Sequence, residues 1–396
     1  MGLTSRTLLL FAIEIAVVAV TATIWWWPVL ARRGWRAVLG RLGMLLGTQF
    51  ALLAVLGLLA NNYFAFYSSW DDLLGTGNNG PVDVRTKAVG ATAGGPAATP
   101  APSEQPTPEP THGPPLPVQE LGREAVDSGG KGRDPKVVGE IRTVRLAGAR
   151  SGLSTDGYVY LPPQYFQPQY QDRKFPAVIV MTGFPGDAKN LITRLNYPGA
   201  ALQLNLSGRM QPTVLVLMRP SPAMPADTEC EDVQDGPRSA TYFAEDVPGS
   251  VALSYRVSAD PQGWGIMGNS TGGYCALKLA MRHPEALPSA ASISGYLKAA
   301  EDVSTGDLFK GSQQRRDEAD LMWRLTNRPQ PAVSLMLAGA EHGDGDFRKE
   351  TDAFTAAAHP PMTVAVASVP EGGHNFQTWT KLLPPALEFL SQHLKA

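Results

Sequence analysis

Apolar residues follow two different patterns along the 396 residues of the chain. Near the start, two apolar runs cover residues 7–30 and 42–60, and each is long enough to cross the hydrocarbon core of a bilayer. From residue 139 onward, short apolar runs alternate with segments of helical periodicity. The middle runs are apolar throughout, as expected of strands that are covered on both faces. This alternation predicts an α/β sandwich with a mostly parallel central sheet.

The pattern also predicts where the elements lie. Strands are expected at residues 140–148, 158–162, 175–181, 212–218, 263–268, 291–295, 332–339 and 362–369. Helices are expected at residues 241–256, 272–282, 315–325, 347–358 and 379–394. Residues 295–330 form a longer connection, which we expect to build a small cap over one end of the sheet.

The two apolar runs predict a transmembrane hairpin over residues 1–70. The short loop between them carries Arg32, Arg33, Arg36 and Arg41, and short arginine-rich loops stay on the cytoplasmic side. Everything after residue 60 is then expected outside the cytoplasm. A cleaved signal peptide is the alternative for the first run. It fits less well, because a Trp-Trp-Trp-Pro stretch and arginines follow where a small-residue cleavage site belongs.

Residues 71–138 are expected to be a disordered linker. Their central part is made of Pro, Ala, Thr and Gly with almost no large apolar residue, so it cannot bury enough surface to offset the entropy of ordering. Its prolines favour an extended, semi-rigid spacer that holds a domain away from the membrane. The chain thus divides into a hairpin (1–70), a linker (71–138) and a globular α/β domain (139–396).

Charge and cysteine content exclude several functions. The formal net charge is −2 and no basic stripe is visible, so no nucleic-acid partner is expected. Two cysteines, Cys230 and Cys275, cannot form a disulfide framework. Two free, buried thiols are the favoured interpretation, and one bridge is the alternative if the domain lies outside the cytoplasm. No metal-binding or nucleotide-binding motif is found in the sequence, so neither a metal nor a cofactor is expected.

A candidate nucleophile lies between a predicted strand and a predicted helix. Residues 268–272 spell G-x-S-x-G around Ser270. A nucleophile elbow needs small residues two positions before and after the serine, and Gly268 and Gly272 meet that need. The serine would then project near the positive end of the helix. The alternative is a Gly/Ser turn that only caps the helix.

A candidate acid and a candidate base follow Ser270 along the chain. The order Ser, acid, His is typical of hydrolases that have a nucleophile elbow. His374 comes directly after the last predicted strand and is the best base among the six histidines. Glu341 is the first choice for the acid because it is nearest the end of the preceding strand, and Asp344 is the second. Asp346 is interpreted more simply as a helix N-cap. The acid would fix the imidazole tautomer and stabilise its charged form.

Two backbone N–H groups are expected to form an oxyanion hole. One belongs to Thr271, the residue after the candidate nucleophile. The other belongs to Phe184, in the loop after the strand at 175–181. Pro185 cannot contribute because proline has no N–H.

These residues resemble the putative-esterase group of α/β-hydrolases, which includes esterase D-like enzymes and the antigen 85 mycolyltransferases. The resemblance covers residues 139–396. It rests on the elbow at 268–272, on "GGHNFQTW" at 372–379, on "MTGFPG" at 181–186 and on "TYFAEDVPGSV" at 241–251. The apolar leader and linker resemble actinobacterial envelope members. The resemblance implies acyl-ester chemistry, with Ser270 as the nucleophile and His374 as the base.

Three functions are compatible with this pattern. The first is a membrane-anchored extracytoplasmic serine esterase, in which water releases the acyl group from Ser270. The second is an acyltransferase that moves the acyl group to a sugar or lipid hydroxyl. The third is a non-catalytic envelope-binding module on the same fold, because a fold alone does not determine function. The expected substrate of the first two is a small acyl ester or a glycolipid.

Overall fold

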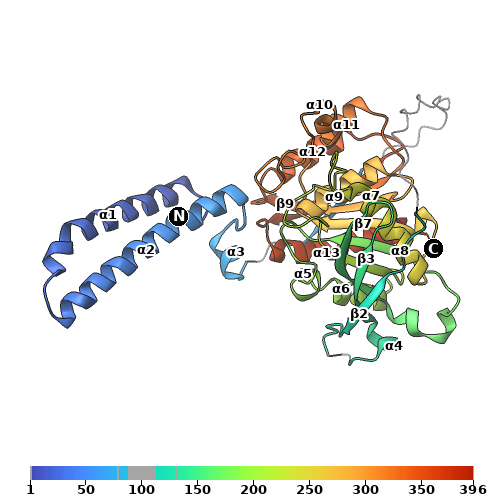
Figure 1. Ribbon diagram of the computed structural model, residues 1–396, viewed down its shortest axis with the longest axis horizontal. Helices are drawn as coiled ribbons and strands as arrows, with labels where there is room; N and C mark the ends of the chain where they lie inside the picture. Colours follow the sequence, from blue (N-terminus) through green and yellow to red (C-terminus); the bar gives the residue numbers. More distant parts are fainter. Residues whose placement is uncertain (1, 78–79, 88–112, 131, 396) are drawn as a thin grey trace. The chain divides into compact units, whose positions relative to one another are not determined.

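The computed structural model describes residues 2–77, 80–87, 113–130 and 132–395, and they fall into two compact units (Figure 1). The first unit contains Met1–Pro81 together with two short segments from later in the chain, Ala340–Asp346 and Val369–Thr378. The second unit contains the remaining segments, Val82–Gly339, Phe347–Ser368 and Trp379–Ala396. The central part of the predicted linker, residues 88–112, lies outside the described residues.

Two long helices make up most of the first unit, α1 (Arg6–Leu30) and α2 (Trp35–Phe64). They pack along each other, and the hydroxyls of Thr23 and Thr48 lie 2.8 Å apart between them. Most of their large apolar side chains are exposed. Both helices are therefore long and apolar enough to cross a membrane. A short helix, α3 (Trp70–Leu74), follows α2.

The described strands form one ten-stranded sheet in the order β1-β10-β9-β8-β7-β5-β6-β4-β3-β2. Strands β6, β5, β7, β8 and β9 pair in parallel, whereas β2, β3 and β4 and the outermost strand β1 pair antiparallel with their neighbours. The strands are β1 (Asp83–Lys87), β2 (Gln119–Glu124), β3 (Glu140–Ala147), β4 (Ser154–Leu161), β5 (Ala177–Met181), β6 (Val214–Met218), β7 (Trp264–Asn269), β8 (Ser289–Ile293), β9 (Ser334–His342) and β10 (Thr363–Glu371).

Helices cover both faces of the central strands. Ile179 of β5 belongs to a buried cluster shared with α8 and α9, and its neighbour Val178 is buried on the opposite face. On that opposite face, a Cβ atom added to Gly265 of β7 would lie 3.4 Å from Leu390 of α13 and from Leu394, which follows that helix. The described helices after β2 are α4 (Pro135–Val138), α5 (Asn190–Thr193), α6 (Tyr197–Leu206), α7 (Ser239–Thr241), α8 (Val247–Ser254), α9 (Thr271–Arg282), α10 (Gln313–Glu318), α11 (Leu321–Asn327), α12 (Phe347–Ala357) and α13 (Phe376–His393), with short turns η1 (Pro163–Phe166), η2 (Pro168–Tyr170), η3 (Tyr242–Asp246) and η4 (Pro261–Gly263).

The predicted fold class is confirmed. Each expected strand and helix is present, although the helix expected at 241–256 is divided into α7, η3 and α8, and the one at 315–325 into α10 and α11. Two strands, β1 and β2, lie within residues 71–138, where only a linker was expected. Both pair through backbone hydrogen bonds at the edges of the sheet, which requires no apolar run in the sequence.

The two cysteines form a disulfide bond, so the favoured interpretation of two free thiols is wrong. The bond joins Cys230, in the connection between β6 and α7, to Cys275 of α9, and both residues are fully buried. The same connection is tied to the helix by Lys278, whose Nζ donates to the backbone oxygen of Glu229 at 2.9 Å. The two segments are 45 residues apart, and nothing in their local sequence indicates that they pack together.

Candidate active site

Ser270 lies in a sharp turn between β7 and α9. Its φ is +55° and its ψ is −126°, a conformation that costs free energy in a residue with a Cβ atom and is typical of functional sites. The Ser270 N–H donates to the carbonyl of Ile293 at 2.9 Å, which fixes the turn against β8. The side chain is half-buried at the start of α9, where the positive end of the helix dipole favours negative charge.

Two glycines allow this turn to form. A Cβ atom on Gly268 would lie 2.5 Å from the carbonyl carbon of Gly272 and 2.7 Å from the carbonyl oxygen of Met181. A Cβ atom on Gly272 would lie 2.5 Å from the same Met181 oxygen. Real Cβ atoms do not approach backbone atoms this closely, so strand and helix can meet only because both positions are glycine. The geometry is therefore that of a nucleophile elbow.

The loop after β5, residues 182–187, runs beside Ser270. A Cβ atom on Gly183 would lie 2.9 Å from the Cβ of Ser270 and 3.4 Å from its Oγ. Phe184 is the next residue in this loop, and Thr271 follows Ser270 at the first position of α9. Within the described part of the chain, neither the Phe184 nor the Thr271 N–H donates to a protein acceptor. Both donors are thus available to a ligand.

His374 and Asp344 lie together in the first unit. Nδ1 of His374 is 2.9 Å from Oδ1 of Asp344. The Asp344 side chain is only 2% exposed, whereas the His374 side chain is 23% exposed. The two loops that carry them are joined by a hydrogen bond from the Gly372 N–H to the carbonyl of His342, at 3.0 Å. A carboxylate hydrogen-bonded at Nδ1 determines which ring nitrogen carries the proton.

Glu341, the first choice from the sequence, is placed differently. It still belongs to β9, which extends to His342, and it is half-buried. Asp344 lies beyond the strand, in a turn between Gly343 and Gly345, which both have positive φ. The turn brings the Asp344 carboxylate, rather than the nearest acid to the strand end, to the ring of His374.

A buried polar network that the sequence did not predict lies beside the elbow. The hydroxyl of Tyr296 is 2.6 Å from Oε1 of Glu229 and 3.0 Å from Oγ1 of Thr271. Glu229 is fully buried, and burial is the main reason that its pKa is raised to about 8. The network therefore connects a buried carboxyl group with a raised pKa to the residue that follows Ser270.

Lys278 supports this network from inside α9. The lysine is completely buried, and its Nζ forms an ion pair with Glu231 at 2.6 Å. Burial alone would raise the pKa of Glu231, but the charges of Lys278, Arg282 and Arg315 together lower it to about 2. A lysine in the middle of an otherwise apolar helix was the one sequence signal for this buried cluster.

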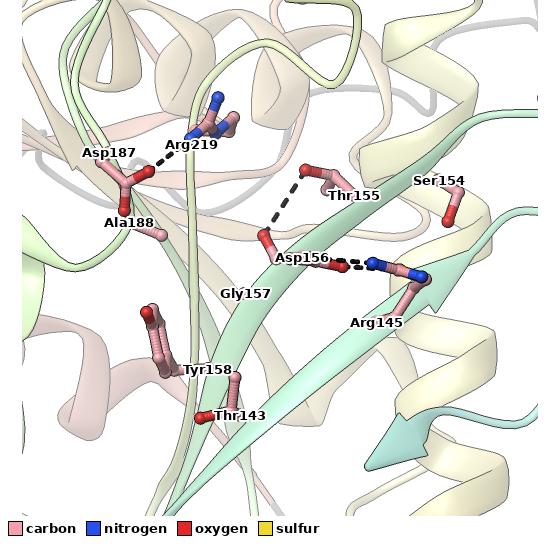
Figure 2. A pocket seen from close by; sticks show the side chains of 10 residues that line it. All are labelled: Thr143, Arg145, Ser154, Thr155, Asp156, Gly157, Tyr158, Asp187, Ala188 and Arg219. Carbon is pink, nitrogen blue, oxygen red and sulfur yellow. Dashed lines mark hydrogen bonds and ion pairs between the residues drawn. The ribbon is translucent and has the colours of Figure 1, made fainter. Parts of the chain in front are cut away.

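A polar pocket of about 660 Å³ opens on the second unit (Figure 2). It is bordered by β3, β4 and the residues after β5 and β6. Arg145 pairs with Asp156 through two bonds of 2.7 and 3.1 Å, and Arg219 pairs with Asp187 at 2.5 Å. The opposite charges of the two ion pairs balance within the pocket, and Tyr158 is a further residue of its lining. Asp187 ends the same loop that runs beside Ser270.

The family described as putative esterase matches residues 149–390. A protein of Corynebacterium glutamicum that is described as uncharacterized is 25% identical over 282 residues, which are 65% of this chain and 63% of that protein. The match thus spans less than two thirds of the relative.

Solved structures of several hydrolases share the fold. A ferulic acid esterase superposes with a TM-score of 0.54 at 17% identity, covering 65% of this chain and 99% of the esterase. An S-formylglutathione hydrolase from Agrobacterium tumefaciens has a TM-score of 0.54 at 15% identity, with coverage of 70% and 100%. A fluorophosphonate-binding serine hydrolase of Staphylococcus aureus has a TM-score of 0.51 at 14% identity, with coverage of 64% and 98%.

Proposed function

This chain belongs to the putative esterase family of α/β-hydrolases, and we propose that it is a membrane-anchored serine esterase that acts outside the cytoplasm. Ser270 is the nucleophile, His374 the general base and acid, and Asp344 the group that orients His374. The N–H groups of Phe184 and Thr271 form the oxyanion hole. The observation that carries the proposal is the strained backbone of Ser270, held between two obligatory glycines at the start of α9.

The topology of the sheet supports the assignment of a triad. Ser270 directly follows β7, and Asp344 and His374 follow β9 and β10 of the same sheet. In sheets of this kind, reactive groups gather beyond the carboxyl ends of the strands. The hydrogen bond between Asp344 and His374 favours Asp344 over Glu341 as the acid. The order of the three residues along the chain is Ser, acid, His, as in other α/β-hydrolases.

The reaction proceeds through an acyl-enzyme. Nε2 of His374 accepts the proton of the Ser270 hydroxyl as Oγ attacks the ester carbonyl carbon. The carbonyl oxygen becomes an oxyanion that accepts hydrogen bonds from the Phe184 and Thr271 N–H groups. The C–O bond to the alcohol breaks, and the alcohol leaves with the proton from His374. Water then attacks the acyl carbon, gives a proton to His374, and releases the carboxylic acid as Ser270 regains its proton.

The placement outside the cytoplasm rests on two features. The loop between α1 and α2 is short and rich in arginine, which favours its retention in the cytoplasm. The bond between Cys230 and Cys275 is of a kind that persists in oxidising compartments. We expect a membrane-impermeant thiol reagent to label an Asp172→Cys variant on intact cells, because Asp172 is exposed. Labelling only after cell lysis would contradict this topology.

Acyl transfer is the second candidate function. It uses the same acyl-enzyme, but a sugar or lipid hydroxyl replaces water. The polar pocket favours it, because Asp187 joins that pocket to the loop carrying the Phe184 N–H and because its charges are balanced. Product analysis with added sugar and lipid alcohols separates the two reactions, since only transfer yields a new ester.

The test of the proposed function uses the full chain in detergent, p-nitrophenyl esters and a fluorophosphonate probe. We expect hydrolysis and labelling in the native protein and in Ser207→Ala, a control at an exposed serine. In Ser270→Ala, labelling should disappear and kcat should fall by about 10³-fold or more. Labelling that persists in Ser270→Ala would refute the nucleophile assignment. Absence of both signals in the native protein would favour the non-catalytic envelope-binding module.

A further inference from the structure

The segment that follows α2, residues 65–72, forms part of the surroundings of His374; we name it the collar. All of its contacts described here lie within the first unit. The His374 N–H donates to the carbonyl of Ala65 at 2.7 Å. The side-chain amide of the next residue, Asn375, donates to the carbonyl of Phe66 at 2.7 Å. The backbone of the candidate base is thus held by the chain that leaves the second apolar helix.

Asp72 is the centre of the collar. Its carboxylate oxygens both lie 3.1 Å from Nδ2 of Asn375, and Oδ2 also accepts from the Ser68 N–H at 2.8 Å. Asp72 is 5% exposed, so water does not compete for these bonds. Hydrogen bonds to a buried carboxylate are among the stronger ones in proteins.

The fit between the collar and the loops carrying His374 and Asp344 is close. A Cβ atom on Gly373 would lie 2.7 Å from Oδ2 of Asp72 and would overlap the carbonyl of Phe66. A Cβ atom on Gly343, next to Asp344, would overlap the side chain of Ser68. Because both glycines lack a side chain, the collar can contact the loop that carries Asp344 and the loop that carries His374.

The collar is itself tied to the end of α2. The amide of Asn61 donates to the carbonyl of Tyr67 at 3.0 Å, and its oxygen accepts from the Tyr67 N–H at 2.8 Å. Asn61 is 7% exposed. The hydrogen bonds therefore run without interruption from an apolar helix, through the collar, to the backbone of His374.

We propose that the collar is a positioning element of the active site, in which Asp72 acts through Asn375 to hold the His374 loop. This inference rests on the proposed function. It means that the second apolar helix and its exit segment contribute to turnover, beyond anchoring the chain. Asp72 and Asn375 are positioning residues, because neither is assigned a contact with substrate.

The pair Asp72 and Asn375 permits a swap experiment in the full chain. Asn375→Asp keeps an oxygen for the N–H groups of Gln377 and Thr378, in the first turn of α13, but it sets a second carboxylate against Asp72. Asp72→Asn in the same chain restores one carboxylate and one amide with their places exchanged. Asp172→Asn, the same substitution at an exposed aspartate outside the collar, is the control.

We expect Asn375→Asp and Asp72→Asn each to lower kcat by about 10- to 100-fold, because small displacements of a catalytic group have effects of this size. KM should change little, and the rate of fluorophosphonate labelling should fall in parallel with kcat. The double variant should recover to within about threefold of the native protein, and Asp172→Asn should have the same kcat as the native protein. Rates are divided by the number of labelled sites at saturation, so that loss of folded protein does not count as loss of kcat.

Two results would overturn the inference. One is a native kcat in both single variants while Ser270→Ala is inactive, which would leave the proposed function intact and remove only the role of the collar. The other is a double variant no better than the single ones, with normal thermal unfolding in all three, which would show that the pair does not act together. Activity that survives in Ser270→Ala would instead remove the proposed function.

Discussion

Replacement of Asp344 by Asn tests the assignment of the acid most directly. The change keeps the size of the side chain but removes the charge that faces Nδ1 of His374 at 2.9 Å. It also lets the amide present an N–H to the ring, which favours the wrong tautomer. Because the Asp344 side chain is 2% exposed, solvent cannot take the place of the lost carboxylate.

The expected loss of kcat in Asp344→Asn follows from the burial of the Asp344 side chain. Removing one partner of a buried ion pair costs about 3–5 kcal/mol. The pair is required in its charged form only while His374 holds a proton, so this cost falls on the transition state rather than on the free enzyme. At 1.36 kcal/mol for each factor of ten, kcat should drop by about 10²–10⁴-fold. Glu341→Gln should stay within about threefold, because its position in β9 is not the one that contacts His374.

The assay compares kcat for a p-nitrophenyl ester and the rate of fluorophosphonate labelling in the two variants. Both rates depend on the activation of Ser270, so both should fall in Asp344→Asn. Thermal unfolding of each variant shows whether folding is preserved. A large loss in Glu341→Gln together with near-native rates in Asp344→Asn would refute the reasoning and restore the first choice made from the sequence.

Two further predictions concern the residues around the elbow. The pKa of Glu229 is raised by burial from an ordinary value of 4.5 to about 8, so the folded state binds the proton more tightly and stability falls as the pH rises from about 4.5 to 8. Glu229→Gln should remove this slope, and its Tm relative to the native protein should be higher at pH 8 than at pH 5; an equal difference at both values would contradict it. Replacing Cys230 and Cys275 together by Ala should lower the free energy of unfolding by about 4 kcal/mol, the loop-entropy value for a separation of 45 residues. A reductant should then lower the Tm of the native protein but not that of the double variant, and equal sensitivity would argue against the bond.

The fold was predictable because its signal is local. Strands β5, β6 and β7 are continuous apolar runs, and continuous runs of this length occur where a sheet is buried on both faces. The position of Ser270 was predictable for the same reason. The glycines at 268 and 272 are needed by contacts within a few residues of the serine, so the motif records the geometry directly.

The carboxylate partner of His374 was harder to predict because a strand end is not visible in the sequence. The strand predicted from the apolar run ends at residue 339, but β9 continues to His342. The true turn therefore begins later, and it brings Asp344 to the ring of His374, whereas Glu341 remains in the strand. An error of two or three residues in a strand boundary is enough to exchange the first and second choices.

The disulfide and the buried network were beyond local reasoning. Cys230 and Glu229 are brought to α9 by tertiary packing across about 45 residues, and the lysine within that otherwise apolar helix is the only hint of this in the sequence. The collar is the extreme case, since Asp72 and Asn375 are 303 residues apart. The contact between the collar and the two loops depends on the burial of Asp72 and on the close approach at Gly343 and Gly373. These features are seen only in the folded structure.

The contacts of the collar show that the chain between α2 and the predicted linker does more than connect two parts of the protein. If the chain after α2 were only an inert tether, it would make no contact with the loops that carry Asp344 and His374. The first unit instead combines α2, the collar and the loops of Asp344 and His374 through hydrogen bonds of 2.7 to 3.1 Å. Asp344 contacts the ring of His374, whereas Ala65 and Asn375 fix the backbone of its loop, so the two sets of contacts constrain different atoms of one residue. In the proposed mechanism His374 accepts and returns a proton twice in each cycle, and both constraints would hold its ring in place for that role.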